Sequence, residues 1–76
     1  MSGTRNRTVL KLKAARVNKG LFQEDVAKLL GCTLLTYQYL ESGKSNLKLE
    51  TALRLVEILG VDSITDIEWP KIGRIK

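Results

Sequence analysis

The sequence has no histidine, one cysteine and one proline among its 76 residues. The absence of histidine removes the side chain that most often serves as a general acid, a general base or a metal ligand near neutral pH. Because Cys32 has no second cysteine to pair with, no internal disulfide is possible, and a reducing cytoplasm is the expected compartment. The chain also lacks a glycine-rich phosphate-binding motif and a metal-ligand cluster, so we expect neither an enzyme nor a cofactor.

Long apolar runs are absent too, and acidic residues are in the minority. No run approaches the roughly 20 residues that cross a bilayer, and the N-terminus lacks the apolar centre of a signal peptide. Lys and Arg number 13 against 8 Asp and Glu, a net charge of +5. This excess favours a polyanionic partner, because each neutralised phosphate releases condensed counterions. A chain of 76 residues forms one small domain with little room for a deep cleft.

Four of the six glycines follow segments whose apolar residues recur at helical spacing. Thr8 and Thr33 precede two of these segments and are the expected N-terminal caps. The expected helices cover about 9–19, about 22–30, 34–42 and about 49–59. A glycine after each helix supplies the left-handed residue that commonly ends one.

The residues outside these four helices predict one further helical turn, an N-terminal arm and a C-terminal tail. Ser63 is the expected cap of one further helical turn within 61–68, and Pro70 prevents a long helix there. We expect a mobile basic arm at 1–7, a helical domain at 8–68 and an extended tail at 69–76. The pattern predicts an all-α fold, a compact bundle of four to five short helices.

Helical wheels assign an inward face to each of three helices. The expected inward residues are Val9, Leu10, Leu12, Ala14, Ala15 and Val17 in the first helix, Val26, Ala27, Leu29 and Leu30 in the second, and Leu49, Ala52, Leu53, Val56 and Leu59 or Ile58 in the fourth. Between Leu30 and Leu34 only three residues intervene, and the first of them is Gly31. Helices joined by so short a turn cross steeply, as in a helix-turn-helix.

Two stretches, Gln23-Glu-Asp-Val-Ala-Lys-Leu-Leu-Gly-Cys-Thr and Leu40-Glu-Ser-Gly-Lys, resemble the Cro and phage-repressor family of helix-turn-helix domains. The resemblance, to lambda repressor-like domains of the XRE type, extends from about Leu12 to Val61. It implies a sequence-specific regulator of transcription, and a repressor in particular. Such a protein binds double-stranded DNA as a homodimer on a two-fold operator. A bacterial cell or a phage-infected host is the implied setting.

The resemblance also implies roles for individual residues. The helix at 34–42 enters the major groove, and its base-reading positions are Leu34, Leu35, Thr36, Gln38 and Tyr39. The implied contacts to the DNA backbone are Gln23, Thr33, Lys44, Ser45 and Asn46, with Arg5 and Arg7 of the N-terminal arm adding non-specific attraction. Arg16 and Glu41 match an ion pair that joins the first helix to the end of the recognition helix.

Several residues depart from the family pattern. Phe22 stands where a capping Ser or Thr is usual, and we expect it to pack on the first helix. Cys32 replaces the common Val and is expected to be a small buried hydrophobe, with a redox switch as the alternative. Leu34, Leu35 and Tyr39 make the recognition face apolar. They read thymine methyl groups or, alternatively, form a patch for a protein partner, as in an anti-repressor or accessory regulator. For Gln38, contact with the phosphate backbone alone is the alternative to base reading.

The C-terminal part carries more large apolar residues than a free tail needs. They are Val61, Ile64, Ile67, Trp69, Ile72 and Ile75. A dimer interface is one explanation, because one copy of so small a domain offers a small footprint on DNA. The other explanation is that these residues fold back and close the core of their own domain.

Overall fold

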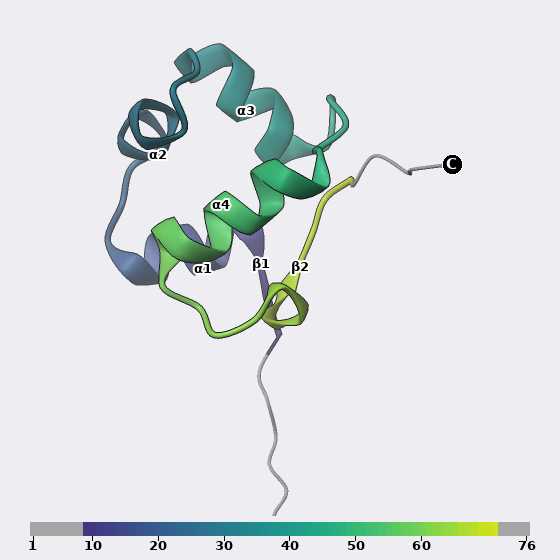
Figure 1. Cartoon of the computed structure of the whole chain (residues 1–76). Helices are drawn as coiled ribbons and strands as arrows, with labels where there is room; N and C mark the ends of the chain where they lie inside the picture. The colour runs from purple at the N-terminus through teal and green to yellow at the C-terminus, as the bar shows by residue number, and fades with distance from the viewer. Residues whose placement is uncertain (1–8, 72–76) are drawn as a thin grey trace, which may run out of the picture.

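The structure is a computed structural model, and it describes residues 9–71. Its elements are β1 (Leu10–Lys11), α1 (Leu12–Lys19), α2 (Gln23–Leu30), α3 (Leu34–Ser42), α4 (Leu49–Leu59), the 3-10 turn η1 (Ile64–Asp66) and β2 (Ile67–Glu68). In Figure 1, α2 and α3 occupy one end of the domain, while β1, β2 and η1 lie toward the other. The all-α fold is confirmed, apart from the two-residue strands.

The ends of the helices are set by local sequence, as predicted. Each of the four helices ends at a glycine with a positive φ, between 70° and 86°. Thr33 caps α3, because its hydroxyl accepts a hydrogen bond from the Thr36 N–H at 3.1 Å. Ser63 caps η1 in the same way, accepting from the Thr65 N–H at 3.2 Å.

The start of the first helix differs from the prediction. α1 begins at Leu12, and Lys11 is its extended N-cap residue, so 10–11 form β1 instead of a helical turn. β1 pairs in parallel with β2, with Leu10 opposite Ile67. The strand exists because a distant segment supplies its hydrogen bonds, and a helical wheel drawn from local sequence contains no such partner. The expected cap Thr8 lies outside the described residues.

The core collects side chains from all four helices and from both ends of the described chain. Its buried hydrophobic residues are Leu12, Ala15, Val26, Ala27, Tyr37, Leu47, Ala52, Leu55, Leu59 and Ile67. Cys32 packs against this core as a small hydrophobe, but it is half-buried and not fully buried as predicted.

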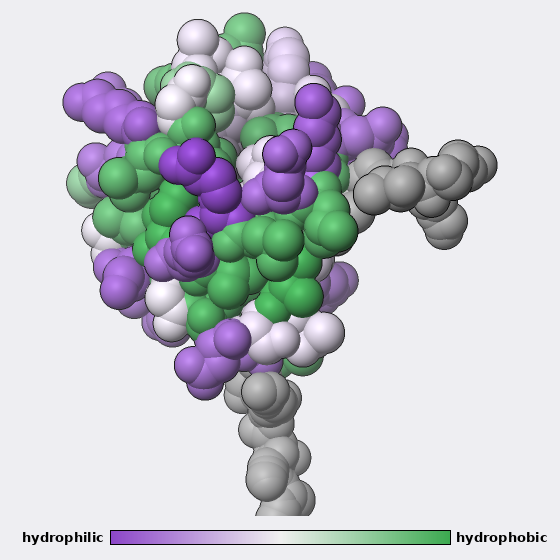
Figure 2. Space-filling model, viewed as in Figure 1, coloured by the Kyte–Doolittle hydropathy of each residue, from purple (hydrophilic) through white to green (hydrophobic). Residues whose placement is uncertain are grey.

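Several predicted core positions are wrong. The expected inward residues that are in fact exposed are Val9, Ala14, Val17, Leu29, Leu49 and Leu53. In α4 the buried face runs through Ala52, Leu55 and Leu59, so Leu53 lies on the flank and is 50% exposed. Figure 2, in the orientation of Figure 1 with α4 toward the viewer, shows that apolar residues form part of the surface on this side. Leu and Val tolerate exposure, so hydrophobicity alone does not fix which of several apolar residues turns inward.

Phe22 also departs from its prediction, because its side chain is 75% exposed and does not pack on α1. The start of α2 is stabilised by a side chain within the helix, because Phe22 has no side-chain group that could cap it. The Phe22 N–H donates a hydrogen bond to Asp25 Oδ2 at 2.8 Å, so Asp25 supplies the carboxylate half of a capping box.

The apolar C-terminal residues close the domain's own core. Ile67 is 3% exposed, while Val61, Ile64 and Trp69 pack partly buried against the same core. The Trp69 indole N–H donates to the Ile64 carbonyl at 2.8 Å, which ties the start of the tail to η1. These four residues thus pack on the core of their own domain, and a dimer interface formed by them stays a prediction.

Candidate nucleic-acid interface

A close crossing of α2 and α3 presents one face of α3 outward. The turn at 31–33 begins with Gly31, whose φ of 80° is costly for any residue with a Cβ. Ala27 is 2% exposed, and its carbonyl accepts hydrogen bonds from the N–H groups of Gly31 and Cys32, both at 2.9 Å. The turn therefore folds back onto the end of α2.

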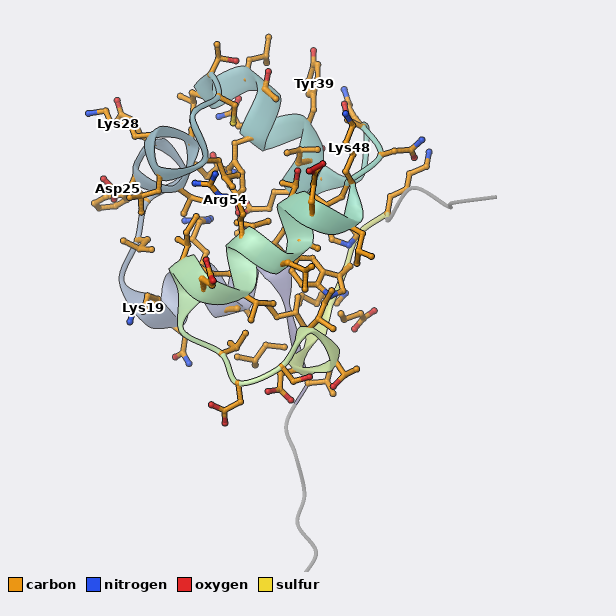
Figure 3. All side chains as sticks on the ribbon, in the orientation of Figure 1. Lys19, Asp25, Lys28, Tyr39, Lys48 and Arg54 are labelled. Carbon is orange, nitrogen blue, oxygen red and sulfur yellow. The ribbon has the colours of Figure 1, made fainter. Side chains whose placement is uncertain are left out.

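Tyr37 fixes the rotation of α3 about its own axis. Its ring is fully buried, and Leu40 packs partly against the same core. The opposite face consequently points to solvent. Leu34 is 41% exposed, Leu35 is 55% exposed, and Thr36 is exposed beside them. Tyr39 is 40% exposed and points away from the body of the domain in Figure 3.

Thr33 and Thr36 form a small polar unit at the start of this face. The Thr33 hydroxyl accepts from the Thr36 N–H and donates to Thr36 Oγ1 at 2.9 Å. With its lone pairs partly engaged, the Thr36 hydroxyl keeps its own O–H to donate. A donor at this position, flanked by Leu34 and Leu35, adds one polar contact to an otherwise apolar surface.

The loop after α3 places cationic and polar groups next to the outward face. The N–H groups of Lys44 and Ser45 both donate to the Tyr39 carbonyl, at 2.9 and 3.2 Å, which folds the loop against the end of α3. The Lys44 ammonium lies 5.5 Å from the centre of the Tyr39 ring, a cation–π distance. Lys44 and Asn46 are exposed, whereas Ser45 is half-buried.

Glu41, at the end of α3, accepts hydrogen bonds from three other side chains. Arg16 of α1 donates through Nε to Oε2 at 2.7 Å and through Nη2 to Oε1 at 3.3 Å. The Tyr37 hydroxyl donates to Oε2, and the Gln23 amide donates to Oε1, each at 2.8 Å. The predicted contact between Arg16 and Glu41 is therefore present as a two-pronged ion pair. Together with the bond from Gln23, this ion pair links α1 and the start of α2 to the end of α3.

The surroundings of this ion pair shift the pKa of each member. Burial works to raise the pKa of Glu41, but the hydrogen bonds from Arg16, Gln23 and Tyr37 outweigh it and hold that pKa below the usual value. The bond to Glu41 raises the pKa of Arg16. Burial, with the bond to Glu41, raises the pKa of the Tyr37 phenol. Glu41 is thus ionised, and Tyr37 neutral, at physiological pH.

The family model described as Helix-turn-helix matches residues 12–64, more than half of the chain. The chain belongs to the helix-turn-helix family. The match is of the XRE and Cro/C1 type, which confirms the resemblance to Cro and phage repressors. α2, the turn at 31–33 and α3 are the helix-turn-helix itself.

Relatives with a similar sequence occur in Saccharolobus islandicus and Saccharolobus solfataricus, and both carry the name HTH-type transcriptional regulatory protein. Each is 38% identical to this chain over 61 residues, which cover 80% of the chain and 20% of the relative. The chain thus spans about a fifth of the length of these relatives. No solved structure matches. Their names describe these relatives as regulators of transcription.

Both relatives are archaeal, so a bacterial or phage setting stays a prediction. Two further findings concern the part of the helix-turn-helix chain that the structure describes. Within residues 9–71, no helix is both long and apolar enough to span a bilayer. In the same range, no three metal-ligating side chains come together.

Sequence reasoning placed Gln23 and Gln38 as separate DNA contacts and missed that they touch each other. Gln38 is half-buried, and its Nε2 donates to Gln23 Oε1 at 3.2 Å. They come from the start of α2 and the middle of α3, which the crossing of the helix-turn-helix brings together. Their spacing along the chain gives no signal of this contact. Arg5 and Arg7 lie outside the described residues, as do Ile72 and Ile75.

Proposed function

We propose that this protein binds double-stranded DNA sequence-specifically by placing α3 in the major groove, and that it represses transcription at a two-fold operator. The supporting observation is the outward face of α3. Leu34, Leu35, Thr36 and Tyr39 are exposed, while Tyr37 and the Glu41 hydrogen bonds hold the helix from behind. An exposed helix on a rigid support is the geometry of direct base readout.

The chemistry of this face favours thymine-rich half-sites. Leu34 and Leu35 have no hydrogen-bonding groups and make apolar contact with the C5-methyl group of thymine. Thr36 supplies a donor for a base-edge acceptor. No arginine or lysine lies on the outward face of α3, so the bidentate contact to guanine that many regulators use is absent from this helix.

Contacts to the phosphate backbone would come from the rim of the same surface. Lys44, Ser45 and Asn46 follow the cap residue Gly43 at the end of α3, and Gln23 and Thr33 stand at the starts of α2 and α3. Their amide, hydroxyl and ammonium groups are the usual partners of phosphate oxygens, and they orient a domain without reading sequence. Arg5 and Arg7 of the N-terminal arm remain predicted contacts.

Dimerisation belongs to the proposal because one domain covers only one half-site. Two copies would bind half-sites about 34 Å apart, one turn of the double helix. The side chain of Ile67 is buried in the core of its own domain, so it is not exposed to a second copy. Val61, Ile64 and Trp69 keep part of their surface exposed, and the predicted tail residues Ile72 and Ile75 follow them.

A protein-binding module is the second candidate, because Leu34, Leu35 and Tyr39 also form an exposed apolar patch. An anti-repressor or accessory regulator would use this patch to bind a protein instead of DNA. Under that function, substitutions on the α3 face would abolish binding of the protein ligand and leave affinity for duplexes unchanged.

Lys44→Ala and Thr36→Ala are expected to affect DNA binding in different ways. Removing the Lys44 charge should weaken binding to every duplex about equally and reduce the slope of log affinity against log salt by about 1. Thr36→Ala should instead change the preference among duplexes by about 0.5–1.5 kcal/mol at one base pair, the usual contribution of one hydrogen bond. Fluorescence titration of both variants against a panel of single-base-pair changes, at several salt concentrations, measures both effects. If neither variant changes duplex affinity, the proposed function is wrong.

A further inference from the structure

Two glutamines link the outward face of α3 to the buried ion pair behind it. Gln38 Nε2 donates to Gln23 Oε1 at 3.2 Å, and Gln23 Nε2 donates to Glu41 Oε1 at 2.8 Å. Gln38, Gln23 and Glu41 thus form a chain of hydrogen bonds that crosses from α3 to α2 and returns to α3. It ends on the carboxylate that Arg16 holds in place.

The chemistry of the chain fixes the orientation of both amides. Glu41 is ionised and can only accept, so Gln23 must turn its NH₂ toward the carboxylate. The Gln23 carbonyl oxygen then faces Gln38, and only the NH₂ of Gln38 can satisfy it. One hydrogen of the Gln38 NH₂ is thereby committed to Gln23, and a base contact that rotated the Gln38 amide would break this bond. The half-buried Gln23 oxygen would then lose its partner, which is costly.

We propose that Gln38 is a positioning residue, which holds the Gln23 amide in the orientation that meets a DNA phosphate and does not read a base. The inference rests on the proposed DNA binding. Gln23 has two amide hydrogens, of which Glu41 takes one. The other stays available for a phosphate oxygen, and the bonds from Gln38 and to Glu41 keep it from rotating. Specificity then rests on Leu34, Leu35, Thr36 and Tyr39.

The test compares Gln38→Met, Gln23→Met and the double variant. Methionine keeps the length of glutamine without its hydrogen-bonding groups. Each single variant should lose affinity about three- to tenfold for every duplex, the range of one hydrogen bond. The double variant should lose no more than the weaker single one, because the two glutamines act as one unit. The order of preference among single-base-pair changes should stay that of the unmodified protein.

Neutral methylphosphonates, placed one at a time in the duplex, separate positioning from a loss of fold. The unmodified protein should lose affinity at the phosphate that Gln23 meets, whereas both single variants should be insensitive there. Leu35→Ala is the matched control on α3 and should keep the phosphate effect while changing sequence preference. The inference is overturned if Gln38→Met alters preference at one base pair, or if the two losses add. If the unmodified protein shows no preference among duplexes, the proposed function fails instead.

Discussion

Glu41→Ala is expected to lower the free energy of unfolding by about 3–5 kcal/mol, the usual cost of removing one partner of a buried ion pair. Arg16 and Glu41 have side-chain exposures of 8% and 5%, so the substitution leaves the guanidinium buried without its carboxylate. It also removes the acceptor of the Tyr37 hydroxyl and of the Gln23 amide. Total stability for a chain of this length is roughly 4–11 kcal/mol. Urea unfolding followed by circular dichroism should therefore show a midpoint at a much lower urea concentration than for the unmodified protein.

Glu41→Gln tests the electrostatic part of this prediction through pH. The pKa of Glu41 is lower in the folded protein than in the unfolded chain, so the ionised carboxylate stabilises the fold above the ordinary value of 4.5. That contribution is lost as the pH falls through the lower folded pKa. The difference in unfolding free energy between the unmodified protein and Glu41→Gln should be greatest near neutrality and shrink in acid. A difference that is independent of pH would show that the charge of Glu41 contributes nothing.

Ile67→Ala is expected to cost about 2–5 kcal/mol of unfolding free energy, the range for truncating a buried large aliphatic residue. Ile67 is 3% exposed and belongs to β2, where its backbone pairs with Leu10. The lost side chain leaves a cavity under the strand pair that joins the two ends of the domain. Leu53→Ala, at a residue that is 50% exposed, is the matched control and should change stability by less than about 0.5 kcal/mol.

The same pair of variants distinguishes the two explanations for the C-terminal apolar residues. A core role predicts that Ile67→Ala lowers the stability of the monomer itself, at protein concentrations where no dimer forms. An interface role predicts unchanged monomer stability and weaker self-association. Sedimentation equilibrium beside the unfolding curves measures both. A stable monomer with weakened association would contradict the position of Ile67 in the structure.

Features that depend on neighbouring residues could be predicted from the sequence. The bounds of α3 and the ends of all four helices were correct, because a glycine with positive φ and a capping hydroxyl act within one turn. The contact between Arg16 and Glu41 spans 25 residues and was inferred from the family resemblance, not from spacing. The outward face of α3 followed from the same resemblance.

Features that depend on distant partners could not be predicted. β1 forms because Leu10 meets Ile67, and no local pattern shows that partner. In α4 several leucines compete for the inward face, and only packing decides that Leu55 is buried while Leu53 is exposed. The bond between Gln38 and Gln23 arises from the crossing of α2 and α3, which sets two amides side by side.

Selection of bound duplexes from a random pool, followed by removal of single methyl groups, tests most directly whether the α3 face reads DNA. The account predicts enriched two-fold sites with thymines opposite Leu34 and Leu35. Replacing one such thymine with deoxyuridine should cost about 0.8 kcal/mol, close to a fourfold loss of affinity. Leu35→Ala should be insensitive to the methyl group that Leu35 contacts. A pool that stays unenriched, or enriched sites that bind equally well with uracil at every thymine, would contradict the account.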